Sequence, residues 1–143
     1  MYHNLSSAIK ITKCADHTAA GTTDVEGTIL DMSGYTGVLF LTSYGTANAN
    51  NILKVQQDDV NAAGGMADLE GTGVVTGTSD EDTWVDVYKP GKRYVRAIAV
   101  VDTSSTVESL WAFQYGAAKE PVDNTTTGTI IGEVHDSPAE GTL

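Results

Sequence analysis

The chain contains little cysteine and few positive charges, and each shortage excludes a class of protein. Cys14 is the only cysteine among 143 residues, so no disulfide can form within the chain and packing must supply the stability. Eight Lys and Arg residues stand against 19 Asp and Glu, which gives a net charge of -11. Binding to nucleic acid or to anionic lipid requires clustered cations. The sequence therefore predicts neither a nucleic-acid partner nor a membrane partner.

Long apolar runs are also missing. The longest nearly apolar stretches, 38–41 and 97–101, are far shorter than the roughly 20 residues that cross a bilayer. The first residues lack the apolar core of a secretory signal, so we expect a protein made in the cytoplasm. Charged residues make up only 19% of the chain, which distinguishes it from a disordered polyelectrolyte and predicts a single folded core.

Threonine is the most frequent residue, and 15 glycines accompany it, a composition typical of strands joined by tight turns. Alternating or continuously apolar segments predict about seven or eight strands and no amphipathic helix. The expected strands cover 8–13, 28–31, 38–43, 52–57, 74–75, 84–88, 93–101 and 108–115. We therefore expect an all-β fold, a single β-sandwich of either jelly-roll or immunoglobulin-like connectivity.

The last predicted strand carries Trp111, Phe113 and Tyr115 on one face, which we expect to form a wall of the core. We expect the sandwich to occupy residues 1–118. Residues 119–143 are acidic and rich in threonine, and they hold too few apolar side chains to build a core of their own. They are either a disordered tail or an extended C-terminal arm that a neighbouring molecule orders.

Residues suited to catalysis or metal binding occur without the context that such sites need. His3, Cys14 and His17 lie close in sequence, but neither a nucleophile motif nor a second ligand pair accompanies them. Asp58, Asp59 and the acidic run 80–82 lack the spacing of a calcium loop. We therefore predict no catalytic residue, no metal site and no cofactor, and read the protein as a non-enzyme.

Two groups of residues are candidates for an interface. The first belongs to a basic cluster, Lys89 with Lys92, Arg93 and Arg96, which holds half of the positive charge. These cations either pair with acidic groups of a neighbouring subunit or balance carboxylates on adjacent strands of the same chain. The second group consists of apolar residues in the C-terminal segment, namely Pro121, Ile130, Ile131 and Val134.

Several segments resemble the head decoration (cement) proteins of tailed bacteriophages. The resemblance spans roughly residues 9–121 and starts with an N-terminal strand, followed by Gly34-Tyr35 before an apolar strand. A strand ending in the sequence QQDD at 56–59 and a glycine-rich loop come next. The sequence KRYVR at 92–96 and a proline at Pro121 complete the pattern.

The resemblance implies a structural virion protein on the outside of the capsid. Such proteins bridge neighbouring major capsid proteins, commonly as homotrimers, and stabilise the head. A neck, tail or minor head subunit of a phage is one alternative, which a sixfold ring would favour over a trimer. A carbohydrate-binding β-sandwich that uses Trp84, Trp111 and tyrosines is another. An exposed planar strip of Trp and Tyr side chains would favour that alternative.

Overall fold

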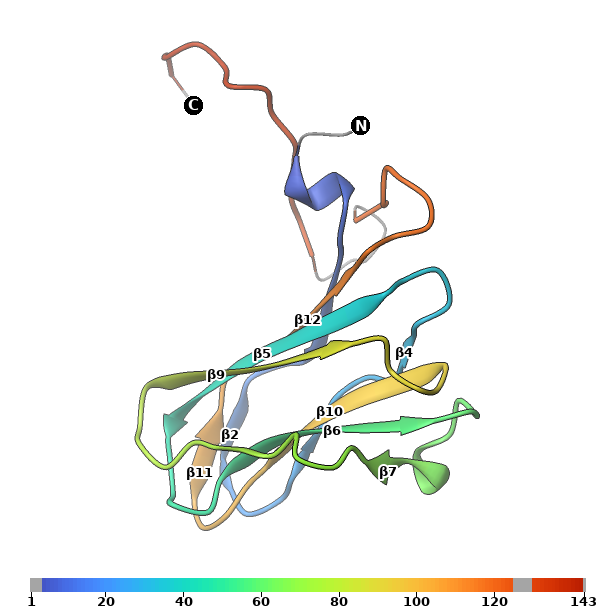
Figure 1. The fold of residues 1–143 in the computed structure, drawn as a ribbon. Helices are drawn as coiled ribbons and strands as arrows, with labels where there is room; N and C mark the ends of the chain where they lie inside the picture. Colours follow the sequence, from blue (N-terminus) through green and yellow to red (C-terminus); the bar gives the residue numbers. More distant parts are fainter. Residues whose placement is uncertain (1–3, 125–129, 143) are drawn as a thin grey trace.

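The computed structural model describes residues 4–124 and 130–142, and these residues form two antiparallel sheets packed face to face (Figure 1). Two 3-10 helices, η1 (Leu5–Ser7) and η2 (Ala63–Gly65), are the only helices in the described part of the chain. The all-β sandwich predicted from the sequence is therefore confirmed. His3 lies outside the described residues.

Each sheet contains six strands. Sheet A consists of β1 (Lys10–Ala15), β2 (Thr18–Gly21), β5 (Gly37–Thr46), β9 (Glu81–Tyr88), β11 (Ser105–Val107) and β12 (Leu110–Tyr115). Sheet B consists of β3 (Val25–Glu26), β4 (Leu30–Asp31), β6 (Ile52–Asp58), β7 (Ala67–Asp68), β8 (Val74–Val75) and β10 (Tyr94–Val100).

The strand pairs are nested from the two ends of the chain toward its middle. β1 and β2 pair with β12 and β11, while β3 and β4 both pair with β10. β5 pairs with β9, and β6 pairs with β7 and β8. Consecutive short strands can be joined into eight ribbons, namely β1–β2, β3–β4, β5, β6, β7–β8, β9, β10 and β11–β12. The first ribbon then pairs with the eighth, the second with the seventh, the third with the sixth and the fourth with the fifth. This order is that of a jelly roll, which decides between the two connectivities that the sequence left open.

Gly27 lets β3 and β4 follow β10 as one ribbon. Its backbone N–H donates to the Ala97 carbonyl at 2.9 Å, between the residues that pair with each short strand. A Cβ at this position would lie 2.8 Å from Cδ2 of Leu110, which projects from sheet A. Only glycine fits where the two sheets approach so closely.

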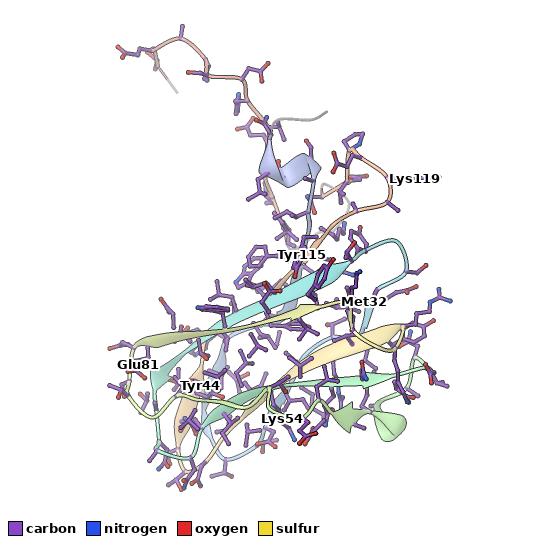
Figure 2. All side chains as sticks on the ribbon, viewed as in Figure 1. Met32, Tyr44, Lys54, Glu81, Tyr115 and Lys119 are labelled. Carbon is purple, nitrogen blue, oxygen red and sulfur yellow. The ribbon has the colours of Figure 1, made fainter. Side chains whose placement is uncertain are left out.

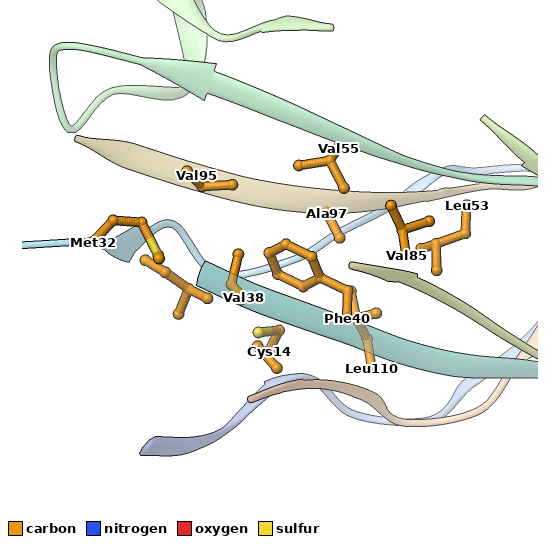
Figure 3. Packing of buried hydrophobic residues seen from close by; sticks show 12 residues of the cluster. Cys14, Met32, Val38, Phe40, Leu53, Val55, Val85, Val95, Ala97 and Leu110 are labelled. Carbon is orange, nitrogen blue, oxygen red and sulfur yellow. The ribbon is translucent and has the colours of Figure 1, made fainter. Parts of the chain in front are cut away.

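The core lies between the sheets and is built from alternate residues of the long strands (Figure 3). β5 contributes Val38 and Phe40, which pack against β6 and β10 across the interior. The larger cluster comprises Cys14, Leu30, Met32, Val38, Phe40, Leu53, Val55, Val85, Val95, Ala97, Leu110 and Ala112. In the predicted 93–101 strand, Val95, Ala97, Ala99 and Val101 are the alternate residues that face the core.

The predicted core wall of β12 is wrong in its direction. Leu110, Ala112 and Gln114 are the buried residues of this strand, and Trp111, Phe113 and Tyr115 face away from sheet B. The alternation was therefore correct, but the larger side chains lie outside. The narrow space opposite Gly27 and Ala97 accepts Leu110 and Ala112, whereas an aromatic residue there would overfill the core.

Four short strands, β2, β3, β7 and β11, were not predicted, because each is too brief to show alternation. The edge strand expected at 74–75 is present as β8. The domain boundary expected between residues 118 and 119 stays a prediction.

Candidate functional site

The outer face of sheet A carries large aromatic and aliphatic side chains in cross-strand rows. In one row, Trp84 of β9, Leu41 of β5 and Trp111 of β12 are neighbours in register. In the next row, Asp86 is beside Leu39, and Leu39 is beside Phe113. We call the set of rings on this side the aromatic face; it consists of Trp84, Tyr88, Trp111, Phe113 and Tyr115.

Gly37 allows Tyr115 to lie across the middle strand of this face. A Cβ on Gly37 would overlap the Tyr115 ring, so the ring occupies the space above the glycine. The Tyr115 hydroxyl donates to Oδ1 of Asp86 on β9 at 2.7 Å. Burial, reinforced by this hydrogen bond, raises the pKa of Tyr115 to about 12. Figure 2 shows the labelled side chain above β5, on the side away from sheet B.

β9 presents carboxylates and rings in strict alternation along the edge of sheet A. Asp82, Trp84, Asp86 and Tyr88 all point outward, while Thr83 and Val85 point into the sandwich. Both rings are largely exposed to solvent, Trp84 to 60% and Tyr88 to 63%. Within the described residues β9 has β5 as its only paired strand, so the other side of β9 is a sheet edge.

The cations near the aromatic face are both engaged. Lys13, next to Trp111 in register, forms an ion pair with Asp16 at 2.6 Å. Lys89 lies over the ring of Tyr88, with its ammonium 5.2 Å from the ring centroid. The face therefore offers ring surfaces and carboxylate acceptors, flanked by lysines that already have partners.

The outer face of sheet B has a different character and carries Arg96, the member of the basic cluster that lies on β10. Arg96 is only 6% exposed, and its guanidinium donates to Oε1 of Gln56 at 2.9 Å and to Oε2 of Glu26 at 3.0 Å. Because Gln56 and Glu26 belong to the strands on either side of β10, this side chain ties three ribbons of the sheet together.

The other two predicted interface cations are also paired within the chain. Arg93 forms two hydrogen bonds to Asp31, of 2.9 and 2.8 Å, which lower the pKa of that carboxyl to about 2. Lys92 lies 3.5 Å from Oδ2 of Asp59 and 3.9 Å from Oδ1 of Asp58. The second interpretation of the cluster, that it balances nearby carboxylates, fits these contacts. A role of Lys92, Arg93 and Arg96 in a subunit interface stays a prediction.

The segment after β12 returns to the beginning of the chain. Val122 donates its N–H to the Ser7 carbonyl at 2.8 Å. The amide side chain of Asn124 accepts from the Ile11 N–H at 2.8 Å and donates to the carbonyls of Ile9 and Ser6 at 2.8 and 2.7 Å. Asn124 therefore satisfies outward-pointing backbone groups of β1 much as a neighbouring strand would.

The predicted apolar interface residues of the C-terminal segment gather at the same place. Pro121, Ile130, Ile131 and Val134 line one pocket together with Ile11 of β1. Ile131 is nevertheless 98% exposed, and both Val134 and Leu5 of η1 are exposed as well. We call residues 4–9, 121–124 and 130–135 the terminal cluster. In Figure 1 this cluster lies beyond one end of the sandwich.

The candidate catalytic residues are not arranged for chemistry. Cys14 is buried in the core, and this burial raises the pKa of its thiol to about 12, which keeps it protonated. His17 is exposed and contacts Glu108 at 3.0 Å instead of Cys14. In the described part of the chain, no three His, Cys, Asp or Glu residues are grouped to hold a metal ion. Nor does any described helix have the length and apolarity to span a membrane.

Comparison with protein-family models and with curated proteins finds no match for this chain. The residues themselves must therefore support any functional assignment. The sequence singled out Pro121, Ile130, Ile131 and Val134, and the structure places them around one pocket, while their role in an interface stays a prediction. Trp84 and Trp111, which the carbohydrate-binding alternative used, lie on the aromatic face, but the sequence did not predict that Trp111 faces outward. The alternation of Trp84 with Asp82 and Asp86 was the available signal, because flanking carboxylates on the same side of a strand indicate that this side faces water.

Proposed function

We propose that this protein is a structural component of a tailed-bacteriophage head that decorates the outside of the capsid and stabilises it. It acts as a homotrimer that bridges neighbouring major capsid proteins. The observation that carries the proposal is the terminal cluster, where apolar side chains are exposed at the point where both ends of the domain are tied together. The resemblance in sequence to head decoration proteins supports the same function.

The terminal cluster has the properties of a surface that grips a neighbour. Ile131 and Val134 are exposed although both are aliphatic, so burial against another molecule is favourable by about 25 cal/mol for each Å² removed from water. The base of the cluster is held rigidly, because Asn124 and Val122 are hydrogen-bonded to residues 6–11. A rigid base lowers the entropy cost of ordering the residues beyond it.

A structural role is also consistent with the distribution of charge. The net charge of -11 keeps the protein soluble before it docks, while a capsid lattice that presents many symmetric binding sites raises the effective concentration of each contact. Binding that is specific for the assembled shell stabilises that shell by mass action.

The test uses the full-length protein and capsids of a phage whose genome carries this sequence, purified without it. We expect the protein to sediment with these capsids, to delay their thermal opening, and to appear at threefold positions in electron micrographs. A double variant, Ile131→Ser with Val134→Ser, should bind capsids about tenfold more weakly, because two exposed aliphatic contacts are removed.

Val60→Ser is the matched control, because Val60 is also an exposed valine but lies in the loop between β6 and η2. It should bind like the unmodified chain. Equal binding by the double variant would remove the terminal cluster from the proposal. Absence of the protein from capsids, or sixfold rings seen in solution, would overturn the decoration function and favour a neck or tail component.

A further inference from the structure

We propose that the aromatic face of sheet A is a binding site for a neutral polysaccharide, with Trp84 as its principal platform. The inference goes beyond capsid decoration and does not depend on it, since the aromatic face and the terminal cluster comprise different residues. It rests on three features of the face: exposed rings, carboxylates between them, and the lack of an unengaged cation among the residues described there.

The rings are placed to contact successive units of an extended chain. Trp84 and Tyr88 are four residues apart on one strand, which separates their backbones by about 13 Å. Trp84 and Trp111 lie in one row with a single strand between them, which separates their backbones by about 10 Å. Leu41 fills the position between these two tryptophans, so the surface connecting the rings is apolar. The C–H faces of sugar rings fit such a surface.

The carboxylates supply the polar half of the recognition. Asp82 and Asp86 flank Trp84 on its own strand and on the same side. Oδ1 of Asp86 accepts the Tyr115 hydroxyl, which holds the carboxylate beside the ring and leaves further acceptor capacity on its oxygens. A ligand suited to this face must therefore bring hydrogen-bond donors together with apolar surface, and hydroxyl-rich sugars have both properties.

The charge of the aromatic face distinguishes between an anionic polymer, a second copy of this chain and a neutral polysaccharide as its ligand. An anionic polymer would meet Asp82 and Asp86 without a free cation, because Lys13 is paired with Asp16 and Lys89 lies over Tyr88. A second copy of this chain docked through the same face would set its own Asp82 and Asp86 against these two carboxylates. A neutral polyol avoids both repulsions, and we therefore commit to it over a protein or nucleic-acid partner.

The two tryptophans make the site directly observable. Trp84 and Trp111 are the only tryptophans in the chain, and both belong to the aromatic face, so intrinsic tryptophan fluorescence reports on this face alone. The full-length protein is titrated with soluble neutral polysaccharides, namely a mixed-linkage β-glucan, a xyloglucan and a galactomannan. Dextran sulfate is the anionic comparison, and native gels cast with each polymer supply a second readout.

We expect at least one neutral polymer to change the tryptophan emission and to retard the protein in the gel, with dextran sulfate inactive. Trp84→Ala should weaken binding about tenfold, whereas Trp84→Phe should retain part of it because a ring remains. Tyr94→Ala is the matched control: Tyr94 is an aromatic residue on the outer face of sheet B, and its loss should leave binding unchanged.

Three outcomes would overturn the proposal. One is that no neutral polymer changes either readout. Another is that binding persists in Trp84→Ala. The third is an emission shift that depends on protein concentration alone and disappears in Trp84→Ala, which would identify the face as a contact between copies. None of these outcomes affects the capsid test, because that test probes Ile131 and Val134.

Discussion

The two sheets obey the same alternation, yet sheet A turns Trp84, Trp111 and Phe113 outward, whereas sheet B turns Arg96 and Lys54 outward. On sheet B, the outward-facing cations have partners in the same chain: Arg96 is hydrogen-bonded to Gln56 and Glu26, and Lys54 pairs with Asp68 at 2.9 Å. Sheet A leaves ring surfaces open to water. Because a sandwich requires only its inward faces to be apolar, the outward faces are free to differ. The outward face that exposes large apolar side chains to water is the one that indicates a binding partner.

The largest expected effect on stability comes from substituting Gly37, the glycine of sheet A beneath the Tyr115 ring. Gly37→Ala places a methyl group inside the Tyr115 ring, so the ring must leave its position and lose the bond to Asp86. We expect a loss of about 2–3 kcal/mol in the free energy of unfolding, measured by chemical denaturation. Gly91→Ala is the control, since its Cβ would lie 3.6 Å from Gln57, an ordinary contact. Equal stability of both variants would contradict the placement of Tyr115.

The corresponding disturbance of sheet B removes its buried guanidinium. Arg96→Ala leaves Gln56 and Glu26 without their donor, and we expect the free energy of unfolding to fall by about 1.5 kcal/mol. Glu26 is partly exposed, so water can replace the lost contact and limit the cost. Arg93→Ala, which removes an exposed cation, should have a smaller effect in the same denaturation experiment. A larger loss of unfolding free energy in Arg93→Ala than in Arg96→Ala would mean that burial does not set the strength of these ion pairs.

The two faces should lose stability at opposite ends of the pH scale. On sheet B, Arg93 lowers the pKa of Asp31 from 3.8 to about 2, so this contribution is complete above pH 3.8 and is lost as pH falls toward 2. On sheet A, the pKa of Tyr115 is raised from 10.0 to about 12, so this contribution is complete below pH 10.0 and is lost as pH rises toward 12.

Single substitutions separate these two contributions. Asp31→Asn should flatten only the acid limb of the curve of unfolding free energy against pH, and Tyr115→Phe only the alkaline limb. Both faces are largely open to solvent, so we expect each change to be modest. If either variant altered the opposite limb, the assignment of the titrating group would be wrong.

The smallest expected effect on stability belongs to the residue with the largest expected effect on binding. Trp84 is mostly exposed, so Trp84→Ala should change the unfolding free energy by less than about 0.5 kcal/mol. A thermal melt of the variant beside the unmodified chain measures this change. A large loss would show that Trp84 stabilises the sheet and is not free for a ligand.

Much of the fold was predictable because the long strands show a clear alternation of residues in the sequence. The grouping of Val95, Ala97, Ala99 and Val101 on one face follows from alternation, and the edge strand at 74–75 follows from the placement of the glycines around it. The direction of β12 was not predictable in the same way. Alternation assigns residues to two faces but does not say which is inside, and the larger rings of Trp111 and Phe113 favoured the wrong choice.

The candidate sites divide along similar lines. The apolar residues near the C-terminus were recognisable because Ile130, Ile131 and Val134 stand out in an acidic, threonine-rich segment. Asn124 was not recognised, since its role depends on the backbone of β1, more than a hundred residues away in sequence. Tyr115 and Gly37 likewise form a unit only through strand pairing, which no local pattern encodes.

The nested pairing has a consequence for how the chain acquires its structure during synthesis. The central pairs, β6 with β7 and β8, become available first, and β1 must wait until β12 has left the ribosome. Until then, the edge that Asn124 finally covers stays open on the nascent chain. Contacts that span nearly the whole sequence close slowly, because the entropy of the intervening loop is lost before they form. Sheet A is therefore completed only after β12 has left the ribosome.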